Sequence, residues 1–173
     1  MTSITVEPIA ADAEVTDALP ICGPEVLSHG TLEMIDLKES KRFYKEFLGL
    51  EVVQHRPFAL NIRKGGSWVI VCLEAGDKVR PLGVRNHWGL DVGSREAVDR
   101  AFEMAHKYKE KYGIRKIMRI RDEDRSYGFY FQDRDYNWWE IEHVEDDKYN
   151  KRFEHGDFFD EAAAPSNRRK KAS

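Results

Sequence analysis

One pattern of strand and helix signals occurs twice along this chain, over residues 28–75 and again over residues 86–144. Each copy begins with a short alternating segment, continues with a helical segment and ends with three more segments of strand character. Such units are stable only when strand faces and helix stripes are buried against one another. The repeat therefore predicts an α+β fold of two paired β-α-β-β-β modules.

Local signals mark the elements of the first copy. Residues 28–37 alternate in polarity, and Asp36 followed by Glu39 is typical of a capping box that begins a helix. Gly49 is expected to end that helix as a C-cap. Three short strands are expected to follow, at residues 50–56, 58–63 and 67–74.

The second copy repeats these signals in the same order. A strand is expected at residues 86–92, and Ser94 is a suitable N-cap for a helix that Gly113 closes. Three further strands are expected at residues 115–121, 127–132 and 138–143. The domain is thereby bounded at about residues 27–145.

Outside the repeat the sequence has no sustained period. Residues 1–26 are rich in Ala, Thr, Asp, Glu and Pro, which predicts a flexible leader. Residues 146–173 form a C-terminal extension of mixed charge, and we expect its end to be disordered. Phe153, Phe158 and Phe159 are expected to pack on the domain or on a partner subunit.

Charge and apolar content exclude several classes of protein. The chain has 28 Lys and Arg against 31 Asp and Glu, so it lacks the strong positive charge of a phosphate-driven nucleic-acid binder. Its longest apolar run, residues 68–73, is too short to span a membrane. No Lys or Arg precedes Lys38, so we expect no secretory signal with its positive first region. The two cysteines, Cys22 and Cys72, suit a reducing compartment. We expect a cytoplasmic protein that acts on a small molecule, not on nucleic acid or membrane.

Alternation divides each expected strand into a helix-facing side and an opposite side. The helix-facing sets are almost entirely apolar, for example Val69, Val71 and Leu73. The opposite sides include Thr31, Cys72, Arg119, Arg121, Tyr130, Glu142, and three residues that stand out: His29, His87 and Glu140. The two histidines lie at equivalent positions of the two first strands. If the modules curl together, two imidazoles and one carboxylate meet in an arrangement that suits a divalent metal, Fe(II) in particular.

Three segments also resemble the vicinal oxygen chelate superfamily: HGTLEMIDLKESKRFYKEFLGL from His29, NHWGLDV from Asn86, and YGFYFQDRDYNWWEI from Tyr127. This superfamily includes glyoxalase I, extradiol dioxygenases, fosfomycin-resistance thiol transferases and bleomycin-binding proteins. The resemblance implies a curled half-barrel sheet with helices outside, and metal ligands at His29, His87 and Glu140. It also implies a homodimer, because relatives pair modules across subunits, and it leaves Mn, Ni or Zn open beside Fe(II).

One turn departs from the family pattern. Arg134 and Tyr136 stand where relatives usually have Pro and Gly. Because Gly reaches positive φ most easily, we expect this turn to be reshaped.

The resemblance leaves four kinds of chemistry open, of which we favour an extradiol-type dioxygenase. Such an enzyme needs three protein ligands, and Tyr130 lies ten residues before Glu140, as in those relatives, where its hydroxyl would hydrogen-bond the substrate oxyanion. His55 is the nearby histidine available as an acid or base.

The alternatives depend on other residues. A glyoxalase-like isomerase needs a fourth ligand near Cys72. A thiol transferase would use Arg119 and Arg121 to hold a phosphonate, with Thr31 matching its pattern. A metal-free binding protein is the last possibility, and the complete ligand set argues against it.

Overall fold

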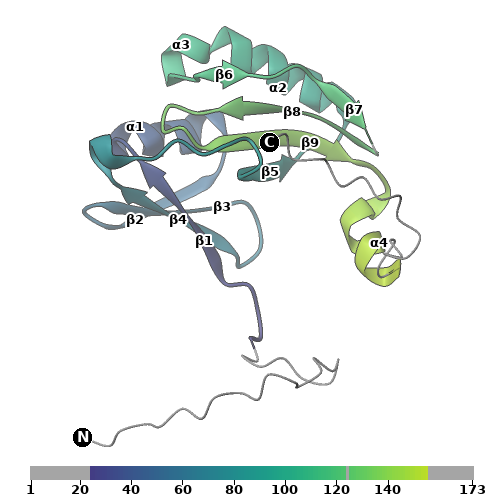
Figure 1. Cartoon of the computed structure of the whole chain (residues 1–173), viewed down its shortest axis with the longest axis horizontal. Coiled ribbons are helices and arrows are strands. Elements are labelled where there is room, and N and C mark those ends of the chain that lie inside the picture. The colour runs from purple at the N-terminus through teal and green to yellow at the C-terminus, as the bar shows by residue number, and fades with distance from the viewer. Residues whose placement is uncertain (1–23, 124, 156–173) are drawn as a thin grey trace, which may run out of the picture.

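The computed structural model describes residues 24–123 and 125–155 and contains two modules, each with its own sheet (Figure 1). The fold is mixed α+β with two curled, unclosed sheets, and this confirms the fold class predicted from the repeat. The helices α1, α2 and α3 lie together on one side of the sheets (Figure 1).

The first module begins at an edge strand and forms a four-stranded sheet in the order β1-β4-β3-β2, with β1 parallel to β4. The Asp36 carboxylate accepts a hydrogen bond from the Glu39 N–H at 2.8 Å, which confirms the expected N-cap of α1. Its elements are β1 (His29–Met34), α1 (Leu37–Arg42), η1 (Phe43–Phe47), β2 (Glu51–Arg56), β3 (Ala59–Arg63) and β4 (Val69–Glu74).

The second module repeats this topology after the short helix η2 (Gly76–Lys78), in the order β5-β9-β8-β6, with β7 also paired to β8. The strand expected at residues 115–121 is divided into two short pieces. The elements are β5 (His87–Asp91), α2 (Arg95–Lys107), α3 (Lys109–Tyr112), β6 (Lys116–Ile117), β7 (Arg121–Glu123), β8 (Ser126–Gln132), β9 (Trp138–Val144), η3 (Glu145–Asp147) and α4 (Lys148–His155).

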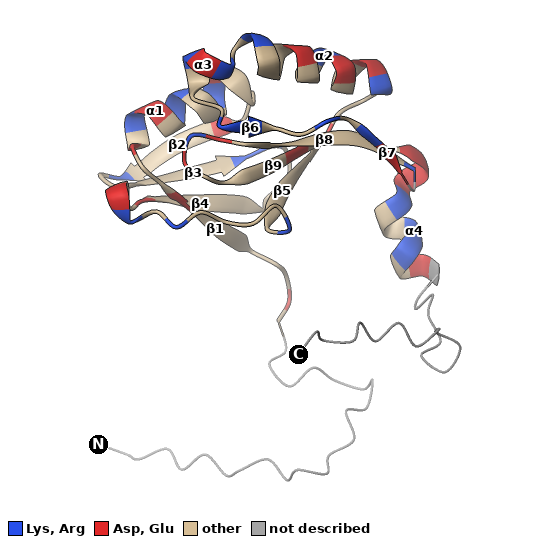
Figure 2. Ribbon diagram, turned by 45° about the horizontal axis from the view of Figure 1, so that its top comes forward, with Lys and Arg blue, Asp and Glu red and all other residues tan. Residues whose placement is uncertain are grey.

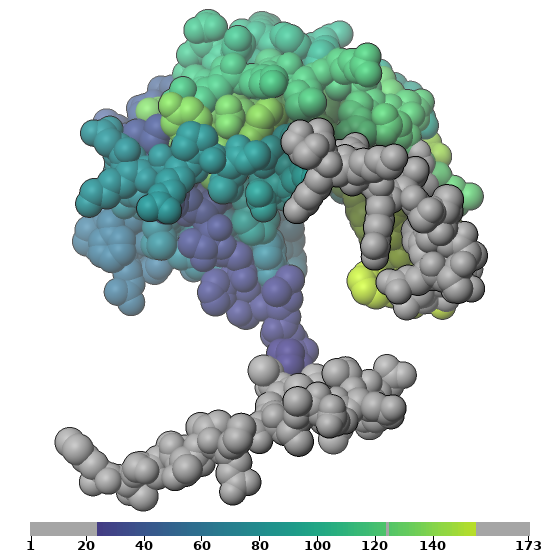
Figure 3. All heavy atoms as spheres, viewed as in Figure 1, coloured from purple at the N-terminus to yellow at the C-terminus, as the bar shows by residue number. Residues whose placement is uncertain are grey.

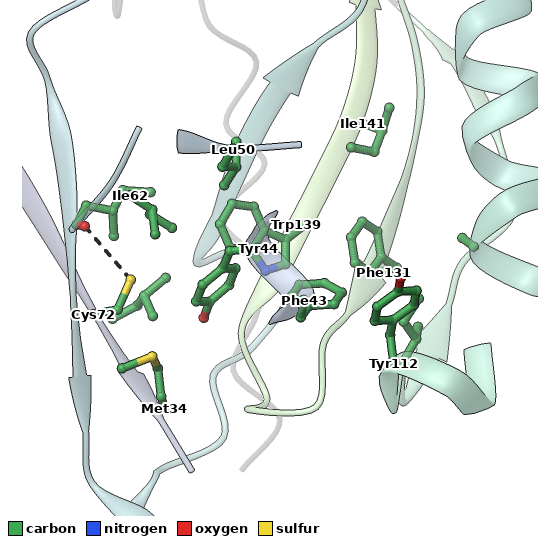
Figure 4. Packing of buried hydrophobic residues seen from close by; sticks show 14 of the residues in the cluster. Met34, Phe43, Tyr44, Leu50, Ile62, Cys72, Tyr112, Phe131, Trp139 and Ile141 are labelled. Atoms are coloured by element: carbon green, nitrogen blue, oxygen red, sulfur yellow. Dashed lines mark hydrogen bonds between the residues drawn. The ribbon is translucent and has the colours of Figure 1, made fainter. Parts of the chain in front are cut away.

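The two modules share one hydrophobic core (Figure 4). Tyr44 of η1 and Trp139 of β9 are fully buried, with ring centroids 5.8 Å apart. Phe43 packs edge-on against Phe131 of β8. Aromatic side chains bury the largest apolar area per residue, so these contacts between modules contribute strongly to stability. Both modules of the described chain are therefore built around a single core.

The face of β4 differs from the sequence expectation. Ile70 and Cys72 point into the core, whereas Val71 and Leu73 are on the opposite side of the sheet. Residues 68–73 form a continuous apolar run, which has no alternation to indicate the buried face. A shift of one residue exchanges the two faces, and this corrects the placement of Cys72 on the polar side.

The turn between β8 and β9 connects the modules. The Asp135 carboxylate accepts hydrogen bonds from the Ile35 N–H at 2.9 Å and from the Ser40 hydroxyl. The Asn137 amide donates to the Glu33 carbonyl at 2.9 Å. These bonds satisfy polar groups that would otherwise be buried without partners, and they fix β1 against the start of β9.

Tyr136 lies in the same turn with a φ of 66°. The turn therefore holds a non-glycine residue in the left-handed region, so the lack of Gly at this position has not removed the positive φ. The Arg115 guanidinium lies 3.6 Å from the centre of the Tyr136 ring, and this cation–π contact offsets part of the backbone strain.

The C-terminal helix α4 follows β9 and stands at the margin of the second module (Figures 1 and 3). Phe153 is 88% exposed, so it does not pack on the domain as one expectation had it. The expected leader up to residue 23, together with Phe158 and Phe159, lies outside the described residues. None of the described helices is both long and apolar enough to cross a membrane. Basic and acidic residues are interspersed along α1, α2 and α3 (Figure 2).

Candidate functional site

His87 of β5 and Glu140 of β9 lie on the same face of two neighbouring parallel strands, offset by two residues in the register. The His87 Nε2 and Glu140 Oε2 atoms are 3.1 Å apart, and the two side chains are 28% and 12% exposed. They line a pocket of about 280 Å³ on the second module. The remaining lining residues are Arg121, Glu123, Ser126, Gly128, Tyr130, Glu142, Lys148 and Tyr149.

The hydrogen bond of the other His87 ring nitrogen determines what Nε2 offers. His87 Nδ1 lies 2.7 Å from the Val84 carbonyl oxygen, which only accepts, so Nδ1 carries a proton. In the neutral ring the lone pair of Nε2 then faces the Glu140 carboxylate. Two acceptors at this distance require a proton between them, on Nε2 or on the carboxylate, or a metal ion. An imidazole fixed through Nδ1 beside a carboxylate is the donor set of many divalent metal sites.

Burial and the carboxylate set the protonation of the neighbouring groups. The pKa of Glu140 is raised above its usual value, because burial and the charge of Glu142 outweigh the hydrogen bond from Tyr130 and the nearby His87, which lower it. Burial, and then the hydrogen bond to Glu140, raise the pKa of Tyr130 well above its usual value. The Tyr130 ring packs edge-on against the His87 ring at 4.9 Å between centroids. Tyr130 therefore remains a hydrogen-bond donor at neutral pH beside the His87–Glu140 pair.

His29, the third expected ligand, does not line this pocket. His29 is exposed on β1, and its Nδ1 is 2.8 Å from the Ser28 hydroxyl. Thr31 is exposed on the same face of that strand. Among residues 24–123 and 125–155, no three His, Cys, Asp or Glu side chains are grouped to hold a metal ion. The structure thus brings together His87 and Glu140, but not His29, within one chain.

Of the other candidate residues from the sequence, some lie at the pocket and some lie away from it. Arg121 and Tyr130 line the pocket, and Arg121 forms an ion pair with Glu123. Arg119 is exposed and does not line it, and His55 is exposed on β2 in the other sheet.

Cys72 is completely buried in the core, which raises the pKa of its thiol. It does not contact the pocket, so its expected role in substrate binding is withdrawn.

Sequence reasoning did not assign five residues that line the pocket: Glu123, Ser126, Gly128, Lys148 and Tyr149. Ser126 begins β8, and Tyr149 belongs to α4, which the sequence left as an aperiodic extension. Both contact Glu142, the residue two positions after Glu140 on the same face of β9. The alternation of β9 placed Glu142 correctly, but no local signal indicated its partners.

Comparison with known proteins was made for sequence and for structure. The sequence model of the family described as Glyoxalase/Bleomycin resistance protein/Dioxygenase superfamily matches residues 27–141. No curated protein matches the chain.

Several solved structures share the fold. A fosfomycin resistance protein, FosX, from Listeria monocytogenes, in complex with Mn(II) and dihydroxypropylphosphonic acid, has a TM-score of 0.58 at 20% identity, covering 75% of this chain and 98% of that one. A lactoylglutathione lyase from Agrobacterium tumefaciens has a TM-score of 0.51 at 18% identity, covering 69% and 94%. A glyoxalase/bleomycin resistance protein/dioxygenase from Nocardioides has a TM-score of 0.55 at 19% identity, covering 76% and 89%. At these identities the likeness establishes the fold.

Proposed function

The chain belongs to the Glyoxalase/Bleomycin resistance protein/Dioxygenase superfamily, and from this premise we propose that it is a metal-dependent enzyme acting on a small substrate with two neighbouring oxygens. The observation that carries the proposal is the His87–Glu140 pair, with Nε2 and Oε2 at 3.1 Å and Nδ1 occupied by a carbonyl. Bound there, a divalent metal, Fe(II) by preference, supplies a Lewis acid and a template for the substrate oxygens.

We propose His29 of a second copy of the chain as the third ligand. The strands β1 and β5, which carry the two histidines, are each at the edge of their sheet. The side of the first sheet that presents His29 leaves Val53 59% and Leu73 36% exposed. On this side the Asn61 Oδ1 is buried without a hydrogen-bond partner. An exposed apolar sheet face with an unsatisfied acceptor is typical of a surface that another protein covers, and a second copy of the chain in a homodimer would cover it.

The donor set favours ring cleavage of the extradiol type over isomerase chemistry. A glyoxalase-like site needs a fourth ligand from β4, but the outward face of β4 offers Val69, Val71 and Leu73. Three protein ligands leave positions for both substrate oxygens and for O₂. The Tyr130 hydroxyl, held as a donor, would stabilise a substrate oxyanion. Thiol transfer is the second candidate, since Arg121 lines the pocket and could exchange its ion pair with Glu123 for a phosphonate.

Metal content tests the ligand assignment. Protein purified without oxygen should contain about one metal ion per chain, as a facial site predicts, and Glu140→Ala and His87→Ala should each lose it. Glu103→Ala, on the exposed surface of α2, is the matched control and should retain it. Full metal occupancy in Glu140→Ala would refute the assignment.

A mixing experiment tests whether the site is shared between copies. His29→Ala and Glu140→Ala should each lose metal, but the two mixed in equal amounts and refolded together should regain part of it. In a shared site, the mixed dimer combines an intact His29 from one chain with an intact His87–Glu140 pair from the other. A site contained in one chain would stay empty in every combination.

The reaction is tested with catechol and O₂. A ring-cleaving dioxygenase should consume oxygen and form a yellow product. Turnover of a glutathione hemithioacetal would instead indicate an isomerase, and conjugation of a thiol to an epoxide phosphonate would indicate a transferase. Metal binding with none of these reactions would favour a binding protein.

A further inference from the structure

The pocket continues past the His87–Glu140 pair to a second carboxylate. Glu142 is only 5% exposed and lines the pocket. Its Oε2 accepts a hydrogen bond from the Ser126 hydroxyl at 2.6 Å, and its Oε1 accepts one from the Tyr149 hydroxyl at 3.0 Å. Strand β8 and helix α4 therefore hold the carboxylate in one orientation.

Two glycines leave room for this carboxylate. A Cβ atom at Gly89 would lie 3.4 Å from the Glu142 Oε1, and one at Gly128 would lie 2.9 Å from the Glu142 Cβ. Gly89 is beside Glu140 in the strand register, and Gly128 is beside Glu142. Gly128 lines the pocket beside Glu142, so no side chain of β8 at this position stands between a ligand and the carboxylate.

The pocket carries more acidic than basic side chains, with Glu123, Glu140 and Glu142 against Arg121 and Lys148. Arg121 is engaged by Glu123, and its guanidinium lies 5.9 Å from the centre of the Tyr130 ring. Lys148 also lines the pocket. An ionised carboxylate offers about four acceptor positions, of which the two hydroxyls use two. Glu142 is therefore a fixed, largely buried acceptor with capacity for another donor.

We propose that Glu142 determines specificity by binding an ammonium group of the substrate. The substrate class is then a molecule with two neighbouring oxygens at one end and a protonated amine at the other. This inference rests on the proposed function, because the oxygens are to be held at the His87–Glu140 pair. Glu142 should bind an ammonium donor more tightly than a neutral donor, since hydrogen bonds between two charged groups are stronger than those between neutral groups.

Three catechols with the same chelating ring test this proposal: dopamine carries an ammonium group, hydroxytyrosol a hydroxyl group and homoprotocatechuate a carboxylate. Their affinities for the Mn(II)-loaded protein are measured by titration calorimetry without oxygen. Dopamine should bind about tenfold more tightly than homoprotocatechuate, as a difference of one charged hydrogen bond predicts, with hydroxytyrosol between them.

Variants connect this preference to Glu142. Glu142→Gln should remove the difference between dopamine and homoprotocatechuate, whereas Glu103→Gln, the same change on the exposed surface of α2, should preserve it. Tyr149→Phe should preserve it as well, because it removes a donor but leaves the carboxylate. Lys148→Met should at most weaken the binding of homoprotocatechuate, so the preference for dopamine should persist in this variant.

The outcomes separate the two proposals. Equal binding of the three catechols by the unaltered protein, or tighter binding of homoprotocatechuate, would overturn the role of Glu142 and leave the metal site standing. A dopamine preference that survives in Glu142→Gln would also overturn it. If Glu142→Gln does not fold, the ranking of the three catechols by the unaltered protein decides. No Mn(II) bound, with none of the three catechols binding, would contradict the proposed function itself.

Discussion

The carboxylate of Asp133 accepts the indole N–H of Trp139 at 2.9 Å inside the shared core. Both residues are fully buried, and the second carboxylate oxygen of Asp133 accepts the backbone N–H groups of Asp135 and Asn137. A single acidic side chain thus fixes the turn that leads into β9.

This arrangement predicts that stability falls as pH rises. Burial, and then the charge of Asp135, raise the pKa of Asp133 to about 7, and Tyr44 and Cys72 are the other titratable groups that face it. Between about pH 4 and 7 the folded state retains a proton that the unfolded chain has lost, so the free energy of unfolding decreases, by at most ~1.4 kcal/mol per pH unit.

Urea unfolding across this pH range measures the effect. Asp133→Asn should be less stable, because its amide would place a donor against the Trp139 N–H. Its free energy of unfolding should nevertheless vary less with pH than that of the unaltered protein. Parallel pH curves for the two proteins would contradict the prediction.

Gly128→Ala should destabilise the second sheet. A Cβ atom at this position would lie 2.6 Å from the Ile141 carbonyl oxygen, so β8 and β9 would have to separate. We expect a loss of about 1–3 kcal/mol, as for other overpacked sites. Gly83→Ala is the control, because no atom lies within 4 Å of its Cβ position, and thermal unfolding should show little change.

The turn at Tyr136 predicts a difference between two substitutions. Tyr136→Ala loses the contact with Arg115 and keeps an L-residue at a φ of 66°. Tyr136→Gly loses the same contact but relieves the backbone strain of an L-residue at positive φ. Tyr136→Gly should therefore be more stable than Tyr136→Ala by about 1–2 kcal/mol in urea unfolding. Equal stabilities would show that the turn changes conformation in one of the variants.

Cys72 should react as a core residue. In a Cys22→Ser background, iodoacetamide should label Cys72 only as the protein unfolds, because the thiol is buried and its pKa is raised. Cys72→Ala should reduce stability by roughly 1 kcal/mol, as small core truncations do. It should leave catechol affinity unchanged. A loss of catechol affinity at unchanged stability would show that Cys72 does contribute to the site.

Much of the fold could be predicted because its signals are local. The Ser94 hydroxyl accepts the Ala97 N–H at 3.2 Å, and Gly113 ends α3 with a φ of 67°, both as the sequence indicated. Capping involves residues three or four positions apart, and side chains alternate along a strand irrespective of distant contacts. The alternation of side chains along β5 and β9 was therefore enough to place His87 and Glu140 on the same face.

The remaining features depend on contacts between distant residues. The apolar run in β4 has no alternation, so only packing decides that Ile70 and Cys72 are buried. The bond from Tyr149 to Glu142 depends on the path of the chain after β9. The spacing of His29 and His87 indicates equivalent places in a repeat, but it does not indicate which copy of the chain supplies each.

The bond from Asn137 to the carbonyl of Glu33 has a mechanical consequence. Asn137 is continuous in sequence with the strand of Glu140, and Glu33 with the strand of His29. The hydrogen bond therefore connects β1 directly to the start of β9, so a shift of β1 along its axis would act on β9. A partner that displaced β1 on docking beside His29 would therefore strain this bond at the start of β9.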